Sequence, residues 1–306
     1  MRSPRGYRTP RLDVTNPSIE SWSIEGADGQ AVLGNTHLPT GDGAGVILIA
    51  HGFKGYKDYG FIPYLADRAA RDGLIAHRFN FSHSGMTNQI ETFERPDLFE
   101  RDTWGKQIQD LATVAAAVKA ETIPGDAAAL PTVWFGHSRG GVTALLAGWR
   151  CFAGDLDDLD PVKPAAIVAA ASPDTTSHLD EGQRKLLMQQ GWLESPSART
   201  GQTLRISPNA LIEIERNPSA FEPCEAVRHL PCPLLFVHGD DDQTVHPDTS
   251  KRMYEIAPQA ELRVLAGATH TFNAPNPMDL AAVAPDQTRQ MVNLVCGFAK
   301  AACTHR

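Results

Sequence analysis

Six short apolar runs, each ending in small or polar residues, constrain this chain more than any other feature of its sequence. Runs that are nearly continuous in apolar residues are typical of parallel strands buried on both faces of a sheet. We therefore predict a strand at each run. The runs are residues 45–50, 74–81, 132–135, 165–171, 233–237 and 262–265.

The segments between these runs have the spacing of amphipathic helices. Apolar residues share one face of 61–71 and of 103–120, and a third helical segment, 287–303, closes the chain. Strands that alternate with helices form a parallel sheet through right-handed crossovers. The pattern predicts an α/β protein with helices on both faces of the sheet.

A tight-turn signal precedes the first of the six runs. Asp28-Gly29 is flanked by strand-like segments at 19–24 and 31–37, which predicts an N-terminal antiparallel hairpin. The expected architecture is a mostly parallel central sheet that this hairpin opens.

The stretch between the fourth and fifth runs is too long for a simple crossover. We interpret about 173–230 as a small helical lid inserted above the sheet, within a single domain at 19–306. Residues 1–18 are predicted to be a flexible tail. The patterns inside the insertion are helical at 179–190, irregular at 191–206 and helical again at 208–217.

A glycine-flanked serine lies between a predicted strand and a predicted helix, in Gly-His-Ser-Arg-Gly-Gly at 136–141. In a G-x-S-x-G turn the glycines are needed because a Cβ would clash, and the serine hydroxyl is held exposed at the sheet edge. The next backbone N–H lies at a helix N-terminus. The motif predicts Ser138 as a nucleophile; the alternative is a glycine-rich connection that only turns a corner.

A nucleophilic serine needs an imidazole to accept its proton and a carboxylate to orient that imidazole. After a turn of this kind the acid comes next in the chain and the histidine last. His270 follows the last predicted strand, where a loop can bring it over the sheet edge, so we predict it as the base. His246 lies too close to the acids, and His305 is expected to be frayed. A surface loop histidine is the alternative for His270.

Three adjacent carboxylates, Asp240, Asp241 and Asp242, follow the fifth run. Neighbouring loop residues point in different directions, so at most one of them can face His270. Three carboxylates can also resemble a divalent-metal site, but no further acidic residues cluster near them in the sequence. We expect no metal and no cofactor. Spacing alone does not choose among the three acids.

Three further motifs carry a resemblance to a known family. They are H-G-F-K-G at 51–55, R-F-N-F-S-H-S-G at 78–85 and H-G-D-D-D-Q-T-V at 238–245. Together with the serine turn they resemble serine hydrolases of the α/β-hydrolase fold, including feruloyl esterases, dienelactone hydrolases and serine aminopeptidase-type members. The resemblance runs from about 46 to 298 and implies that Asp242 is the triad acid. Ser82 and His83 depart from the family pattern, in which a glycine-bearing stretch is commoner.

Negative charge that develops on a substrate carbonyl oxygen requires fixed hydrogen-bond donors. The backbone N–H of Arg139 is expected to supply one. The second is expected from the loop after the first parallel strand, and the resemblance implies the N–H of Phe53. The alternative is that residues 51–52 form only a turn. Because both donors are backbone groups, changing either side chain should reshape the pocket more than abolish the oxyanion hole.

Four side chains are predicted to contact substrate: His137, Trp192, Lys54 and His83. Lys54 follows the oxyanion loop and could meet a carboxylate or phenol on the substrate; a solvated loop face is its alternative. His83 could instead form hydrogen bonds within its own loop. Trp192 is expected to cover the site with apolar surface or to belong to the insertion's own small core.

Charge and composition exclude several function classes. The 28 basic and 36 acidic residues give a net charge of −8, which argues against nucleic acid as a partner. The longest apolar run, 164–171, is far shorter than the ~20 residues that span a bilayer. Five cysteines without regular spacing favour reduced thiols and a cytoplasmic protein. Monomer and homodimer both remain open.

The predicted function is hydrolysis of a small-molecule carboxylic ester through an acyl-enzyme. The resemblance implies small acyl, aryl or hydroxycinnamoyl esters. Acyl-peptide or other amide hydrolysis is the nearest alternative, followed by thioester or acyl-transfer chemistry. From a different class, the chain could be a catalytically idle binding protein on the same fold.

Overall fold

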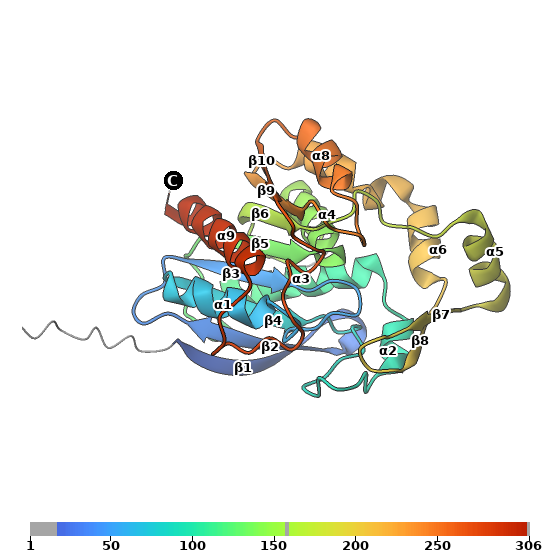
Figure 1. Cartoon of the computed structure of the whole chain (residues 1–306), viewed down its shortest axis with the longest axis horizontal. Coiled ribbons are helices and arrows are strands. Elements are labelled where there is room, and N and C mark those ends of the chain that lie inside the picture. Colours follow the sequence, from blue (N-terminus) through green and yellow to red (C-terminus); the bar gives the residue numbers. More distant parts are fainter. Residues whose placement is uncertain (1–16, 157–158, 305–306) are drawn as a thin grey trace, which may run out of the picture.

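The computed structural model describes residues 17–156 and 159–304, and its helices pack around one central sheet. The predicted tail, apart from residues 17 and 18, and His305 lie outside these ranges. Within them, eight strands form one sheet in the order β1–β2–β4–β3–β5–β6–β9–β10 (Figure 1). The strands are β1 (Ser18–Glu25), β2 (Ala31–Leu38), β3 (Gly45–Ala50), β4 (Leu74–Asn80), β5 (Thr132–His137), β6 (Pro164–Ala170), β9 (Leu234–Gly239) and β10 (Ala260–Leu265).

The strand directions confirm the predicted mostly parallel sheet with an N-terminal antiparallel hairpin. β2 pairs antiparallel with both β1 and β4, and every other neighbouring pair is parallel. In the turn between β1 and β2, a short 3-10 helix, η1 (Ala27–Gly29), places Asp28 and Gly29 at φ 53° and 69°. Glycine and aspartate tolerate this left-handed backbone better than most residues, which is why the pair is a turn signal.

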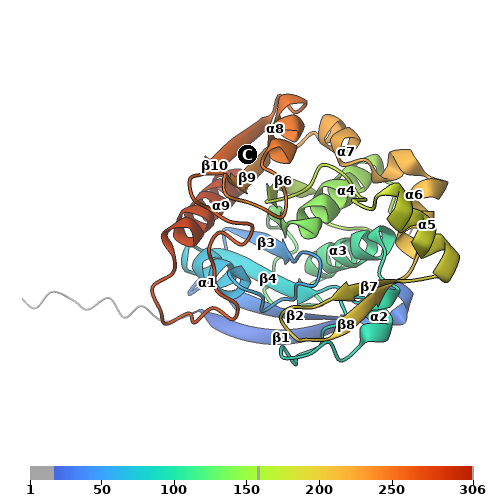
Figure 2. The ribbon, with the colours of Figure 1, turned by 45° about the vertical axis from the view of Figure 1, so that its right-hand side comes forward.

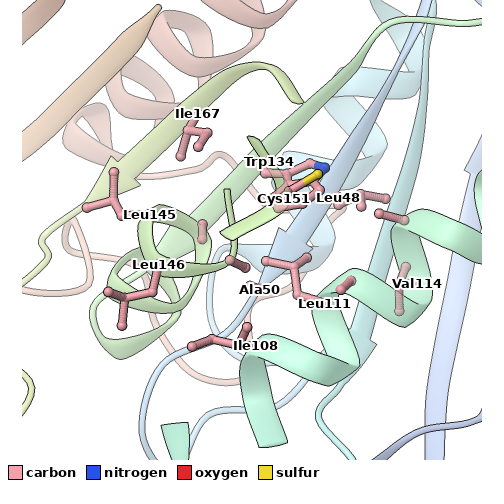
Figure 3. Packing of buried hydrophobic residues seen from close by; sticks show 14 of the residues in the cluster. Leu48, Ala50, Ile108, Leu111, Val114, Trp134, Leu145, Leu146, Cys151 and Ile167 are labelled. Carbon is pink, nitrogen blue, oxygen red and sulfur yellow. The ribbon is translucent and has the colours of Figure 1, made fainter. Parts of the chain in front are cut away.

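Helices cover both faces of the sheet, as Figures 1 and 2 show. α1 (Ile62–Arg71) and α9 (Asp286–Thr304) pack on one face, and α3 (Trp104–Lys119), α4 (Arg139–Ala153) and α7 (Pro223–His229) pack on the other. Figure 3 shows Ile108 and Leu111 of α3 and Leu145 of α4 lying against strand residues such as Leu48 and Trp134. Because all of these are buried, the strand ends that carry polar residues are held rigidly at one sheet edge.

The insertion contains more regular structure than its sequence predicts. α5 (Glu181–Gln190) and α6 (Asn209–Arg216) match the predicted helices. The prediction of irregular structure at 191–206 is wrong. There β7 (Leu193–Pro196) and β8 (Thr203–Ile206) pair antiparallel. Each strand is only four residues long, so the alternation of polar and apolar residues in β8 is too short to be recognised, and β7 has none.

Not all of the insertion lies above the sheet. α7, which lies near the C-terminal end of the insertion, packs into the main core against α4 through Ala226 and Val227. A 3-10 turn, η2 (Pro218–Phe221), leads into α7. The segment that projects from the body therefore consists of α5, β7, β8 and α6, at one side of the molecule in Figure 2. Two further helices, α2 (Pro96–Glu100) and α8 (Asp248–Glu255), complete the described elements.

A buried carboxylate on α3 ties the loop after β4 to the body. Asp110 is fully buried and accepts hydrogen bonds from the backbone N–H of Ala27, 2.8 Å, and from the N–H and hydroxyl of Ser82, 2.8 and 2.7 Å. Ser82 therefore holds its loop through Asp110, which accounts for this departure from the family motif. Burial raises the pKa of Asp110 to about 7, although these hydrogen bonds lower it.

The raised pKa of Asp110 predicts a pH-dependent stability. An unfolded aspartate titrates near ~3.9, so the stabilising contribution is complete below about pH 4 and is lost as pH rises through about 7. We expect the free energy of unfolding to fall by roughly 2–3 kcal/mol between pH 5 and pH 8 from this group. Urea unfolding of Asp110→Asn should show a flatter pH dependence, whereas the exposed Asp42→Asn should keep the wild-type slope. Equal slopes in all three proteins would contradict this expectation.

Candidate active site

Ser138 occupies a strained turn between β5 and α4. Its backbone has φ 54° and ψ −122°, a region that residues with a Cβ rarely adopt. The flanking glycines permit the close approach that the turn needs. A Cβ on Gly136 would lie 2.1 Å from the carbonyl oxygen of Gly140, and one on Gly140 would lie 2.4 Å from that of His51. The serine side chain is thereby presented at the sheet edge, partly exposed.

His270 and Asp242 meet at the same edge, in the loops that follow β10 and β9. The distance between His270 Nδ1 and Asp242 Oδ2 is 2.8 Å. The other carboxylate oxygen of Asp242 accepts from the backbone N–H groups of Thr244 and Val245, at 2.8 and 2.9 Å. Asp242 is 3% exposed, whereas Asp240 and Asp241 are exposed, so only one of the three adjacent acids is buried beside the imidazole.

The hydrogen bonds around Asp242 keep it ionised. Burial on its own raises the pKa of a carboxyl group, but the hydrogen bonds from His238, His270 and the N–H of Val245 outweigh burial here. The pKa of Asp242 therefore lies well below its ordinary value. An ionised Asp242 can accept a hydrogen bond from the Nδ1–H of His270, which leaves Nε2 of His270 as the basic nitrogen.

His238 supports Asp242, a contact that the sequence reasoning missed. Its Nε2 lies 3.1 Å from Asp242 Oδ2 and 2.9 Å from the carbonyl oxygen of Val245. Because both partners are acceptors, Nε2 carries the proton, and Nδ1 accepts from the hydroxyl of Ser250 at 2.6 Å. The side chain is fully buried. The histidine that opens the motif at 238–245 was the available signal.

His137 connects the serine turn to the His270 loop. Its Nε2 lies 2.8 Å from the carbonyl oxygen of His270, and the two imidazole centroids are 4.9 Å apart. Burial, with the neighbouring His270, lowers the pKa of His137 to about 3, so the ring is neutral and its N–H donates to that oxygen. The structure thus places His137 between the serine turn and the His270 loop, outside the residues that line the cavity beside Ser138. Within the described residues Ser138 Oγ has no hydrogen-bond partner.

Two backbone N–H groups beside Ser138 have no acceptor among the described residues: those of Phe53 and Arg139. A Cβ on Gly52 would lie 3.0 Å from the Cβ of Ser138, so the loop after β3 touches the serine turn. The loop is held by His51, whose Nδ1 donates to the carbonyl oxygen of Gly52 at 2.8 Å. These two donors are available for a negatively charged oxygen, as the sequence predicts for an oxyanion hole.

A cavity of about 330 Å³ opens beside Ser138. Phe53, Phe99 and Trp104 supply aromatic surface from the body. The inserted segment covers the cavity with apolar side chains, because α5, β8 and α6 contribute Leu187, Ile206, Ala210, Leu211 and Ile214. The cavity has the size and the mainly apolar lining of a site for a small organic molecule.

The side chains predicted to bind substrate do not line this cavity. Lys54 donates to the carbonyl oxygen of Pro196 at 2.6 Å and so joins the loop after β3 to the inserted segment. His83 is fully buried, with its Nδ1 2.9 Å from the hydroxyl of Ser82. Trp192 stacks under the guanidinium of Arg205 at 4.3 Å. His83 thus makes a hydrogen bond within its own loop, the alternative expected from the sequence, whereas sequence spacing does not reveal the contacts of Lys54 and Trp192.

An ion pair in the cavity wall was also missed. Arg139 Nη2 lies 3.2 Å from Asp102 Oδ2, and the guanidinium lies 4.3 Å above the ring of Trp104. Burial raises the pKa of Asp102 to about 6, while the charge of Arg139 and the hydrogen bond from Gln107 lower it. No motif signals a contact between residues so far apart in the chain.

Within residues 17–156 and 159–304, no three His, Cys, Asp or Glu side chains are grouped so that they could hold a metal ion. Across the same ranges, no helix has the length and apolar character that a membrane crossing needs.

This sheet, with helices on both faces and a serine on the turn after β5, has the architecture of the α/β-hydrolase fold. The chain belongs to the alpha/beta hydrolase family, whose model matches residues 46–284. Comparison with curated proteins finds no significant match.

Solved structures with the same fold include several hydrolases. Est1E from Butyrivibrio proteoclasticus has a TM-score of 0.64 at 15% identity, over 93% of this chain and 99% of that one. A further structure of Est1E has ferulic acid bound. The esterase domain of a Rhodothermus marinus protein gives 0.61 at 18% identity, over 93% and 98%. Dienelactone hydrolase from Anabaena variabilis gives 0.57 at 18% identity, over 92% and 97%. At these identities the likeness shows the fold.

Proposed function

We propose that this protein is a serine hydrolase that cleaves carboxylic esters through an acyl-enzyme. The observation that carries the proposal is the hydrogen bond between His270 and Asp242, 2.8 Å, at the sheet edge where the turn presents Ser138. A serine, an imidazole and an oriented carboxylate are the parts of a nucleophilic triad. The two unpaired N–H groups of Phe53 and Arg139 supply the matching oxyanion hole.

In the proposed mechanism Ser138 Oγ attacks the acyl carbon while His270 Nε2 accepts its proton. Asp242 holds the Nδ1 proton of His270 and stabilises the imidazolium that forms. The N–H groups of Phe53 and Arg139 donate to the carbonyl oxygen as it becomes negative. The alcohol then leaves with the proton from Nε2, and water releases the acid by the same steps. The hydrogen bond from Ser138 to His270 belongs to the substrate complex, since such bonds commonly tighten only there.

The cavity beside Ser138 supports small acyl or aryl esters as substrates. Its volume of about 330 Å³ and its aromatic wall suit a compact apolar or aromatic group. Hydroxycinnamoyl esters fall within this class, and Est1E, which shares the fold, has ferulic acid bound in one of its structures. We further propose that the chain forms one catalytic domain and that the inserted segment, α5 to α6, acts as its lid. Amide substrates are the competing class.

Labelling with a fluorophosphonate probe tests the proposal, because only an activated serine reacts with it. We expect rapid labelling, mapped to Ser138 by mass spectrometry, and protection by a good ester substrate. A panel of p-nitrophenyl acyl esters, methyl ferulate and aminoacyl amides then separates esterase from amidase activity. Failure to label the folded protein would favour an idle binding protein, and faster turnover of amides would favour the peptidase class.

A further inference from the structure

The Arg139–Asp102 pair provides the charged side chains in the lining of a mainly apolar cavity. The guanidinium lies between two aromatic rings, 4.3 Å from the centroid of Trp104 and 5.7 Å from that of Phe53. Arg139 follows Ser138 directly, so its side chain enters the cavity next to the proposed nucleophile. Its position calls for an explanation beyond packing, because a buried arginine needs polar partners.

The hydrogen bonds of this pair are incomplete. Arg139 Nε and Nη2 and Asp102 Oδ1 are buried and have no hydrogen-bond partner among the described residues. The ion-pair distance of 3.2 Å therefore reflects proximity without a well-directed hydrogen bond. Asp102 has 8% of its side chain exposed and Arg139 16%. Buried polar atoms of this kind are usually satisfied, so these three call for an explanation. Nη1 of Arg139 also has no hydrogen-bond partner among the described residues, but it is not buried, so it is the nitrogen that a molecule in the cavity can reach.

The neighbours of the pair hold it in place. The indole N–H of Trp104 donates to the carbonyl oxygen of Thr176 at 3.0 Å, which fixes the ring under the guanidinium. Asp102 Oδ2 accepts from Gln107 Nε2 at 2.7 Å, and Gln107 Oε1 in turn accepts from the hydroxyl of Thr143 at 3.0 Å. A donor that is fixed before substrate arrives selects among substrates more sharply than a mobile one.

We propose that Arg139 determines substrate specificity by donating a hydrogen bond to an uncharged acceptor, such as a ketone, ether or hydroxyl oxygen, on the substrate group that fills the cavity. The inference rests on the proposed esterase function. Asp102 balances the charge of Arg139, so the cavity offers a directed donor without net positive charge. A carboxylate at the same place would face Asp102 and is therefore disfavoured. The predicted substrate class is an ester with a compact, mostly apolar group that carries one neutral acceptor.

Matched esters test the proposal on the wild-type enzyme. p-Nitrophenyl 4-oxopentanoate, 5-oxohexanoate and 6-oxoheptanoate are compared with the pentanoate, hexanoate and heptanoate, and the same keto groups are placed on the alcohol of acetate esters. We expect kcat/KM for at least one keto ester to exceed that of its alkyl partner by about tenfold, the effect of one hydrogen bond from a charged donor. Ratios within twofold throughout both series would overturn the proposal.

Two variants identify the group responsible. Arg139→Met keeps the backbone N–H and removes the guanidinium, so the keto preference should disappear; the ratio of two substrates on one protein cancels any general loss of rate. Asp102→Asn removes the balancing charge. It should therefore raise kcat/KM for p-nitrophenyl hydrogen glutarate, relative to the pentanoate, by about tenfold over the wild-type ratio. A keto preference that survives in Arg139→Met would contradict the assignment.

A binding measurement separates failure of this inference from failure of the proposed function. If no ester is hydrolysed, the proposed function fails. Calorimetry with Ser138→Ala then still compares methyl 5-oxohexanoate with methyl hexanoate in the cavity, and the keto ester should bind more tightly by about tenfold. If the two methyl esters bind equally, Arg139 does not donate a hydrogen bond to the ligand and this inference fails. If esters are hydrolysed without a keto preference, the esterase proposal stands and this inference does not.

Discussion

Ser138→Ala should lower kcat for ester hydrolysis by roughly 10⁴- to 10⁶-fold, the largest effect that we expect from any single substitution in this chain. The change removes the attacking oxygen but keeps the Cβ, so the backbone at φ 54° is no more strained than before. The N–H groups of Phe53 and Arg139 also remain. Residual hydrolysis should therefore be limited to what binding and the oxyanion hole supply. The measurement is kcat with a p-nitrophenyl ester, together with loss of fluorophosphonate labelling.

Ser219→Ala is the matched control for this variant. Ser219 is exposed in η2, and its hydroxyl donates to Asn217, outside the cavity lining, so both activity and labelling should match the wild type. Near-normal hydrolysis by Ser138→Ala would reject Ser138 as the nucleophile. The melting temperatures of Ser138→Ala and Ser219→Ala should agree within a few degrees, which excludes unfolding as the cause of the lost activity.

Asp242→Asn should lower kcat by about 10⁴-fold through the proton arrangement of His270. The amide oxygen can still accept from the N–H groups of Thr244 and Val245, as Oδ1 does now. The amide nitrogen then replaces Oδ2 and presents hydrogens to His270 Nδ1. His270 must accept there and carry its proton on Nε2, so it can no longer accept a proton from Ser138. Steady-state kinetics with the same ester measures the effect.

Asp241→Asn is the control because Asp241 is exposed beside Asp242. It should keep activity within about twofold of wild type, as surface substitutions usually do. Asp242→Asn should also lower the melting temperature, since the N–H on His238 Nε2 would lose an acceptor in the buried loop. Loss of activity in Asp241→Asn with retention in Asp242→Asn would show that the wrong carboxylate has been proposed.

The parts of the fold that the sequence predicts are those that depend on local pattern. Five of the six apolar runs became strands that are buried almost throughout, because continuous apolar residues suit a sheet covered on both faces. The sixth became the edge strand β10, in which Arg263 and Val264 are exposed. The serine turn was recognisable because Gly136 and Gly140 meet backbone atoms at distances that no Cβ allows. The strands β7 and β8 are too short to show such a pattern, and they are stabilised by tertiary contacts: their pairing with each other and the burial of Leu204 of β8 beside Phe99 of α2.

The candidate site divides in the same way. Chain order predicted His270 as the base, but choosing Asp242 needed the family resemblance, because three adjacent aspartates have the same chemistry. In the structure the choice depends on which carboxylate the N–H groups of Thr244 and Val245 surround. Substrate contacts of His83 and His137 remain predictions; the sequence did not reveal that both rings are buried and lie outside the lining of the cavity. The contact between Arg139 and Asp102 arises from tertiary packing alone.

Hydrogen bonds join the inserted segment to the start of α3, beside the cavity. Glu213 of α6 accepts from the backbone N–H of Gly105 at 3.1 and 3.0 Å and from the hydroxyl of Thr103 at 3.2 Å. A carboxylate in this place caps the first turn of α3 and offsets its dipole. Swinging α6 outward would uncap that helix, which carries Trp104 into the cavity wall and places Gln107 against Asp102. The roof and the wall of the cavity are therefore joined, so that opening the proposed lid at α6 would also break the cap of the helix that forms part of the wall.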